Sequence, residues 1–420
     1  MTLLEKIKKG KLDHVFAELY GKSADLPAQR KRYARITRPD TKWLFSTSGR
    51  TELAGNHTDH NHGFVLAASI NLDTIAAVSP ANDNTVTIAS EGYDPVSISI
   101  DDLEVHPEEA GRTEALVRGI ARNFSDRGFK IGGFTAYTTS SVLKGSGLSS
   151  SAAIEVLTAT IFNHLFAQDS LSTTELAIIG QYAENVFFGK PCGLMDQIAC
   201  ANGGIVSIDF ADPTKPKVRT VNFDFSDVTH GHTLVVVDTG GNHADLTDEY
   251  AAIPFDMKKV ASLLGHRTLN QVGQSELMKN LPLLRTELKD DRALLRAIHF
   301  INETRRAKLM YSLLKKDDFT TYLQMVRESG SSSFEFLQNV YCSKDTTEQG
   351  LSLALALSSS FLKDSGAYRV HGGGFAGTIQ VYVPTSILHN YIAFMEKLFG
   401  KGSCTVLTIR QKPTMCIAED

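Results

Sequence analysis

The sequence predicts an α+β fold with two lobes. The chain has 420 residues, more than a single hydrophobic core usually organises. Helical and strand-like segments are mixed along it, which is typical of α+β proteins. The polar, proline-containing stretch at 212–217 is the best candidate for a junction, so we expect lobes at residues 1–212 and 213–420.

The first part of the chain predicts helices, then strands, then helices again. Residues 1–40 have a helical pattern rich in Lys and Arg. Apolar and polar residues alternate over 63–100, as in half-buried strands. Apolar residues then recur at helical spacing over 113–127 and 151–167.

The later segments continue this mixture. A further helix begins with a Ser-x-x-Glu capping box at Ser172 and ends near Gly189. The apolar run at 232–238 predicts a buried strand, and the charged, helical pattern of 256–329 predicts helices with solvated faces. A glycine cluster precedes an alternating strand pattern at 378–384.

Composition narrows the class of protein. Hydrophobic residues make up 42% and charged residues 21%, which is ordinary for a globular chain. The formal charge of −4 gives no support for nucleic-acid or anionic-membrane partners, and no apolar run approaches bilayer-spanning length. The N-terminus lacks the features of a signal peptide, and the five scattered cysteines favour a reducing compartment. We therefore expect a cytoplasmic protein, and the oligomeric state stays open.

Residues 144–153, Lys-Gly-Ser-Gly-Leu-Ser-Ser-Ser-Ala-Ala, form the most informative stretch. Gly145 and Gly147 lack a Cβ, so the backbone can close around an anion. A helical period begins at Ala153, and the N-terminus of a helix offers unpaired N–H groups and a positive dipole end. The loop suits a phosphate group, with serine hydroxyls as donors and Mg²⁺ ligands. It matches neither Walker A nor Gly-x-Gly-x-x-Gly, and a solvated turn has the same composition.

A second dense segment runs from Gly49 to Gly63 and crowds Arg, Asn, His and Asp together. This mixture suits a small substrate with several hydroxyls, because each hydroxyl asks for both a donor and an acceptor. A metal site is the competing interpretation, since His57, His60 and His62 are close in sequence. Their spacing does not match the usual zinc patterns, and a polar loop with satisfied histidines is also compatible.

A third segment, residues 191–197, contains Asp196 between Met and Gln. This aspartate is a candidate acceptor or general base, although an Asp in a turn is usually a cap or turn former. Glu184 lies upstream at the flank of an apolar helix face. It is a candidate metal-binding carboxylate, with an exposed Glu as the alternative.

These segments, taken in their order along the chain, resemble the motifs of the GHMP kinase superfamily and, within it, the galactokinase family. Residues 49–63 are similar to the sugar signature Gly-Arg-x-Asn-Leu-Ile-Gly-Glu-His-Thr-Asp-Tyr-Asn-x-Gly. Residues 143–152 are similar to Pro-x-Gly-x-Gly-Leu-Ser-Ser-Ser-Ala, and 372–377 to Gly-Gly-Gly-Phe-Gly-Gly with Ala376 inside it. Cys-Gly-Leu-Met-Asp-Gln at 192–197 is close to the galactokinase Cys-Gly-Ile-Met-Asp-Gln.

The resemblance implies a GHMP-kinase-like architecture of two lobes, with mixed sheets flanked by helices and the active site in the cleft between them. It implies a kinase that transfers the γ-phosphoryl group of ATP to the C1 hydroxyl of a galactose-type sugar, with Mg²⁺. Asp196 matches the base that accepts the hydroxyl proton. Arg50 matches the cation that lowers the pKa of that hydroxyl or stabilises the transferring group, and beside Asp196 it would keep this carboxylate ionised.

The resemblance also implies binding residues. The sugar contacts are Asn56, His57, Asp59, Gly193 and Tyr250. The ATP contacts are Gly145, Ser146, Gly147, Leu148, Ser149, Ser150, Ser151, Gly373 and Gly374. Glu184 and either Ser151 or Ser150 would hold Mg²⁺.

Departures from the family pattern bear on the substrate. Asn56 stands where the signature has a Glu that is expected to bind the sugar C6 hydroxyl. An amide removes the negative charge and adds donors, so galactose is the first choice and galacturonate the alternative. Leu143 replaces a Pro, and Asn242 replaces the Arg that precedes His243.

Other functions are compatible with parts of the sequence. A non-catalytic sugar and ATP sensor on the same fold is the main alternative, but the presence of Arg50, Asp196 and the phosphate loop favours an enzyme. Kinases for mevalonate or homoserine lack a signature like the one at 57–59. A metal-dependent hydrolase built on the three histidines is the remaining alternative.

Overall fold

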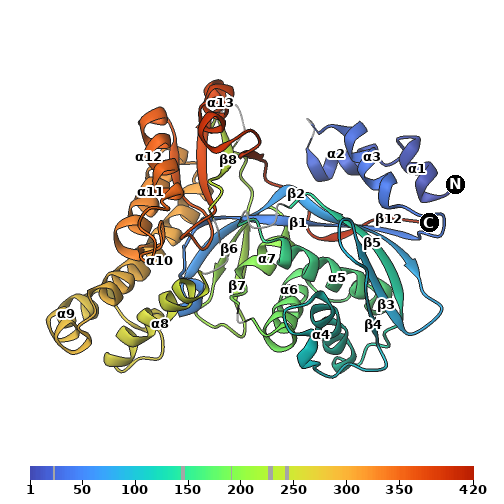
Figure 1. The fold of residues 1–420 in the computed structure, drawn as a ribbon, viewed down its shortest axis with the longest axis horizontal. Helices are drawn as coiled ribbons and strands as arrows, with labels where there is room; N and C mark the ends of the chain where they lie inside the picture. Colours follow the sequence, from blue (N-terminus) through green and yellow to red (C-terminus); the bar gives the residue numbers. More distant parts are fainter. Residues whose placement is uncertain (22–23, 143–146, 191, 226–229, 242–245) are drawn as a thin grey trace.

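The computed structural model describes residues 1–21, 24–142, 147–190, 192–225, 230–241 and 246–420. In these ranges the strands form one eight-stranded and one four-stranded sheet, and helices flank both (Figure 1). This arrangement agrees with the α+β architecture expected from the sequence.

The larger sheet is built around two long strands, β1 and β2. Its main order is β12-β1-β2-β5-β3-β4, with β6 pairing β2 and β7. Pairing is antiparallel except between β3 and β5. The strands are β1 (Trp43–Ala54), β2 (Phe64–Pro80), β3 (Thr85–Ser90), β4 (Val96–Ser99), β5 (Phe134–Ser140), β6 (Ile205–Asp209), β7 (Lys217–Val221) and β12 (Met415–Glu419).

Helices cover both faces of this sheet, which explains why β1 and β2 are buried along nearly their whole length. Successive side chains of a strand point to opposite faces. Leu44 accordingly packs in the core with α1–α3, while its neighbour Phe45 packs in the core with α4 and α5. The helices are α1 (Leu3–Lys8), α2 (Asp13–Tyr20), α3 (Leu26–Ile36), α4 (Thr113–Asp126), α5 (Ser150–Ala167), α6 (Thr173–Tyr182) and α7 (Met195–Asn202).

Local signals in the sequence predicted most of these helices. The region expected to be helical at 1–40 contains three short helices, and α2 is followed by Gly21, whose φ of 87° suits glycine. The capping box of Ser172 and Glu175 is present at the start of α6. Wider turns at Ala183–Phe188 continue that helix to Gly189, as expected.

The smaller sheet has the strand order β11-β8-β10-β9, all antiparallel. Its two central strands have the bounds that the sequence predicted. The elements of this part are β8 (His232–Asp238), β9 (Ala367–Val370), β10 (Thr378–Pro384), β11 (Cys404–Leu407), α8 (Thr247–Leu263), α9 (Gln274–Leu288), α10 (Asp291–Lys315), α11 (Phe319–Ser332), α12 (Gly350–Leu362) and α13 (Leu388–Phe399).

Residues 212–216 connect β6 to β7, and these two strands of the larger sheet pair with each other. A boundary at 212–213 would therefore separate two paired strands. The end of the chain also returns to this sheet, since β12 pairs with β1. We propose that the first lobe contains residues 1–225 together with β12, and that the second begins at β8. Among the described residues, no helix is both long and apolar enough to cross a bilayer.

Candidate active site

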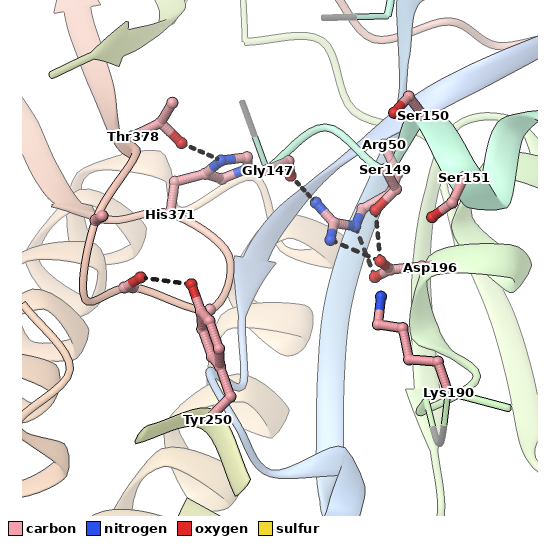
Figure 2. Close-up of a pocket in the computed structure, with 13 residues that line it drawn as sticks. Arg50, Gly147, Ser149, Ser150, Ser151, Lys190, Asp196, Tyr250, His371 and Thr378 are labelled. Atoms are coloured by element: carbon pink, nitrogen blue, oxygen red, sulfur yellow. Dashed lines mark hydrogen bonds and ion pairs between the residues drawn. The ribbon is translucent and has the colours of Figure 1, made fainter. Parts of the chain in front are cut away.

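A cavity of about 300 Å³ opens where β1, the N-termini of α5 and α7, and the loop between β9 and β10 meet (Figure 2). It brings together residues that the sequence places in five separate segments. It is lined by Arg50, Gly147, Ser149, Ser150, Ser151, Lys190, Asp196, Tyr250, His371, Gly373, Gly374, Ala376 and Thr378.

Arg50 and Asp196 form a two-point ion pair in this cavity. Arg50 donates from Nε to Oδ1 of Asp196 and from Nη2 to Oδ2, both at 2.8 Å. Paired parallel bonds of this kind are among the strongest between side chains. The Arg50 side chain is 7% exposed and that of Asp196 is 34% exposed. The cation is therefore held by the protein while the carboxylate stays open to a ligand.

The surroundings keep Asp196 ionised. Burial tends to raise the pKa of its carboxyl group, but the charge and hydrogen bonds of Arg50 and the hydrogen bond from Ser149 Oγ outweigh burial. Lys190, which extends toward Asp196 (Figure 2), acts in the same direction. The pKa of Asp196 consequently lies below the ordinary value, and at neutral pH this group is an acceptor.

The described part of the expected phosphate loop lies against Arg50. The Arg50 backbone N–H donates to Leu148 O at 3.1 Å, and its Nη1 donates to Gly147 O. Gly147 has a φ of 69°, which glycine adopts without strain. Leu148 is fully buried, so its side chain does not reach the cavity.

The start of α5 suits an anion. Ser149 precedes the helix but does not cap it with its side chain, because its hydroxyl is used on Asp196. Ser149 therefore leaves the first-turn N–H groups of α5 without a side-chain cap, and Ser150 and Ser151 line the cavity beside them. Gly145 and Ser146 lie outside the described residues, as does Leu143.

The third glycine motif forms the opposite wall. Tyr250 Oη donates to Gly374 O at 3.0 Å. A Cβ on Gly373 would lie 2.4 Å from Tyr250 Cε1, so only glycine fits against this ring. His57 Nε2 lies 2.9 Å from Gly373 O. Tyr250, Gly373 and Gly374 thus lie against one another and all line the cavity.

His57, Asp59 and Gly193 lie beside the cavity but do not line it. A Cβ on Gly193 would fall 2.0 Å from Asp59 Oδ2, so these two residues are in close contact. The ring of His57 is 6.1 Å from that of His60. Burial, together with His60, lowers the pKa of His57 to about 4, so His57 is a neutral hydrogen-bonding group at neutral pH.

Asn56 is fully buried, away from the cavity wall. Its Nδ2 donates to Gly372 O at 2.7 Å and to Glu52 Oε1 at 3.1 Å. Its Oδ1 accepts from Asn339 Nδ2 at 2.9 Å. The expectation that Asn56 contacts the sugar is not supported by this position, because protein groups already use its donors and its acceptor. The Asn56 side chain instead contacts the backbone of the 372–377 glycine loop at Gly372.

Glu184 is buried, with its side chain 5% exposed, which does not fit the alternative of an exposed Glu. Its carboxylate accepts from Gln197 Nε2 at 3.0 Å and lies 3.4 Å from Lys190 Nζ. Across the described ranges, no group of three or more His, Cys, Asp and Glu side chains is arranged to hold a metal ion.

Lys190, His371 and Thr378 line the cavity and were not predicted as site residues. His371 Nδ1 lies 3.1 Å from Thr378 Oγ1. Only their position in the sequence could have indicated Lys190 and His371 as site residues. Lys190 directly precedes the segment of Asp196, and His371 directly precedes the glycine motif. A lone Lys or His without a spacing pattern does not indicate a site by itself.

Two family models match the chain. The model "GHMP kinases N terminal domain" matches residues 115–204, and the "Galactokinase galactose-binding signature" matches residues 31–80. The chain is 32% identical over 375 residues to a galactokinase of Streptomyces coelicolor, covering 88% of this chain and 92% of that relative. It is 29% identical over 363 residues to a galactokinase of Clostridium tetani, covering 86% and 88%.

Solved structures share the fold. The crystal structure of Lactococcus lactis galactokinase complexed with galactose has a TM-score of 0.77 at 20% identity, covering 93% of this chain and 100% of that chain. A mevalonate kinase has a TM-score of 0.61 at 14% identity, covering 88% and 99%. Fold, family models and relatives together define an ATP-dependent sugar kinase of the GHMP superfamily. Within that class, the chain belongs to the galactokinase family.

Proposed function

We propose that the protein transfers the γ-phosphoryl group of ATP to the C1 hydroxyl of galactose, with Asp196 and Arg50 as the catalytic residues. The observation that carries this proposal is the Arg50–Asp196 pair, which lies 2.8 Å apart beside the N-terminus of α5. A carboxylate that can accept a hydroxyl proton and a helix start that can hold phosphates then share one cavity.

The low pKa of Asp196 fits a particular kind of phosphoryl transfer. Transfer of a phosphoryl group passes through a loose transition state, in which positioning and charge neutralisation provide most of the rate. The attacking hydroxyl can keep its proton until late, so a weakly basic carboxylate suffices as the acceptor. Asp196 orients the C1 hydroxyl and takes its proton, while Arg50 stabilises the negative charge that develops.

ATP binds with its phosphates at the start of α5. Gly147, Ser149, Ser150 and Ser151 surround the phosphates there, and the glycines of the 372–377 loop close the other side. Lys190 lines the same cavity and adds a positive charge near the phosphates.

Mg²⁺ fits the donors present. This ion usually keeps several waters and takes one or two carboxylates together with substrate phosphates, so it needs no cluster of three side chains. Ser151 and Glu184 would hold it, supplying a hydroxyl and a carboxylate. When bound, the ion neutralises phosphate charge.

The sugar is galactose, bound next to Asp196 by His57, Asp59, Gly193 and Tyr250. Galacturonate is an alternative only if Asn56 contacts the sugar in place of the Glu of the signature. Because Asn56 is fully buried and bonded to Glu52, Gly372 and Asn339, the change from Glu to Asn gives no ground for an acidic sugar.

The test is ADP release with ATP, Mg²⁺ and a panel of galactose, galacturonate, N-acetylgalactosamine and arabinose. We expect strong release with galactose and a product whose ³¹P–¹H coupling places the phosphate on C1. Preference for galacturonate would overturn the choice of sugar. Sugar and ATP binding without ADP release would identify a sensor and overturn the proposed reaction.

A further inference from the structure

Two buried carboxyl groups from different segments meet near the cavity. Glu155 lies on α5 and Glu184 in the turns at 183–188, and they are 1% and 4% exposed. Gln197, on α7, is 1% exposed. Its Nε2 donates to Glu155 Oε2 and to Glu184 Oε2, both at 3.0 Å. One amide nitrogen thus uses both of its hydrogens to hold two carboxyl groups.

The orientation of this amide is set by its neighbours. The reverse orientation would turn Oε1 of Gln197 toward the carboxyl groups of Glu155 and Glu184 and would remove the donor that both now share. Space is also restricted, since a Cβ on Gly180 of α6 would lie 3.2 Å from Glu155 Cβ and 3.5 Å from Gln197 Cγ. The three polar side chains therefore have little freedom to rearrange.

Each element that Gln197 joins carries part of the proposed machinery. The first helix, α5, begins with Ser150 and Ser151 at the cavity. The second segment carries Glu184, which is 3.4 Å from the cavity-lining Lys190. The third, α7, carries Asp196 directly before Gln197. These segments are distant in sequence, and the amide links them on the buried side of the site.

We propose that Gln197 is a positioning residue that holds Glu184 and the phosphate-binding helix in register with Asp196. Its two hydrogen bonds aim the Glu184 carboxylate and fix the start of α5 relative to the residue that accepts the hydroxyl proton. When a residue that hydrogen-bonds to a metal ligand is replaced, metal affinity or activity typically falls by about 10-fold to 100-fold. This inference rests on the proposed roles of Asp196 and Glu184.

The experiment replaces the amide by a side chain of similar length without donors, Gln197→Met. We expect the Mg²⁺ concentration for half-maximal turnover to rise about tenfold and kcat to fall about tenfold. The affinity for a non-hydrolysable ATP analogue with Mg²⁺, measured by calorimetry, falls as well. The affinity for galactose alone stays within about twofold, because Gln197 is not among the sugar contacts.

The matched control is Gln380→Met. Gln380 is an equally buried amide whose Nε2 donates to Thr51 Oγ1 and Glu52 O on β1, not to carboxylates. This change lowers the unfolding temperature but leaves the Mg²⁺ dependence unaltered. A folded Gln197→Met variant with wild-type Mg²⁺ dependence, kcat and analogue affinity would overturn the proposal.

A second variant tests the proposal in case Gln197→Met does not fold. The double exchange E155Q/Q197E keeps two carboxylates and one amide but moves the amide from α7 to α5. It is expected to fold and to show the same defects, and wild-type values would again overturn the role of Gln197. If the wild-type protein phosphorylates no sugar, the proposed function fails, while the binding of the Mg²⁺ and ATP analogue still decides whether Gln197 positions the nucleotide side.

Discussion

Glu52 and Asn56 are in contact below the glycine loop, with Asn56 Nδ2 3.1 Å from Glu52 Oε1 and 3.3 Å from Oε2. The galactokinase signature has Asn at the first of these positions and Glu at the second. The chain therefore keeps one acid and one amide in contact but exchanges their places. Arg369 donates to Glu52 and balances its charge. The exchange accounts for Asn56 without a change of substrate.

This relationship predicts that the two positions are energetically coupled. Asn56→Glu alone would place a second carboxylate against Glu52 and against Gly372 O, which is now 2.7 Å from the amide. An uncompensated buried charge lowers the free energy of unfolding by about 3 kcal/mol. The double exchange E52N/N56E recovers at least half of that loss, as urea unfolding of the four proteins would measure.

Independent, additive effects of the two substitutions would contradict the coupling. The double exchange also tests the substrate argument, because it restores the signature order. The preference for galactose over galacturonate should be the same in E52N/N56E as in the wild type, whereas a switch of preference would show that position 56 contacts the sugar.

Asp196→Asn tests the proton acceptor. The amide keeps the size of the side chain but loses the charge that pairs with Arg50 and accepts the proton. We expect kcat to fall by about 10³-fold, within the range for loss of acid–base catalysis, with sugar affinity changed only a few-fold. Steady-state kinetics and calorimetry with galactose measure these two quantities, and unchanged turnover would remove Asp196 from the mechanism.

Gly193→Ala tests the contact between the Asp196 segment and the sugar signature. The added Cβ would lie 2.0 Å from Asp59 Oδ2, so Asp59 has to move. The KM for the sugar should rise at least about tenfold, since a displaced acceptor loses a hydrogen bond to a hydroxyl, while ATP affinity is retained. Gly273→Ala is the control, because a Cβ there meets nothing within 4 Å. Equal sugar KM values for both variants would contradict the placement of Asp59.

Glu303 predicts an acid-sensitive contribution to stability. Burial alone would raise its pKa, but the charges of Arg306, His299 and Arg369 and the hydrogen bond from Ser329 lower it to about 2. A carboxyl group whose folded pKa lies below its unfolded value of 4.5 stabilises the fold above that value, and the contribution is lost as pH falls toward 2. The full contribution is about 3 kcal/mol.

Glu303→Gln should therefore be less stable than the wild type at pH 6, and the difference in the free energy of unfolding should shrink as the pH falls to about 3. Urea unfolding at several pH values measures both curves. Glu328→Gln, at a side chain that is 45% exposed, is the control and should leave the curve unchanged. A pH-independent difference for Glu303→Gln would contradict the pKa assigned to Glu303.

Local signals in the sequence determined much of the secondary structure and the identity of the chemical segments. The bounds of β8 and β10 and the capping box of Ser172 were predicted correctly, because periodicity and capping depend on residues within one element. The composition of the phosphate loop and of the Asp196 segment likewise indicated their chemistry without any knowledge of their neighbours.

Only the tertiary structure decided which of these residues meet. Arg50 and Asp196 are 146 residues apart in the chain, and the sequence linked them through family resemblance alone. Glu52 lies in the same segment as Asn56, but no pattern in the sequence marked the two as partners, and none linked Gln197 to Glu155. Such contacts depend on which face of a strand or helix each side chain occupies after packing. That choice is made by the whole core, so a substitution that suggests a new substrate in the sequence can be a compensated exchange in the folded protein.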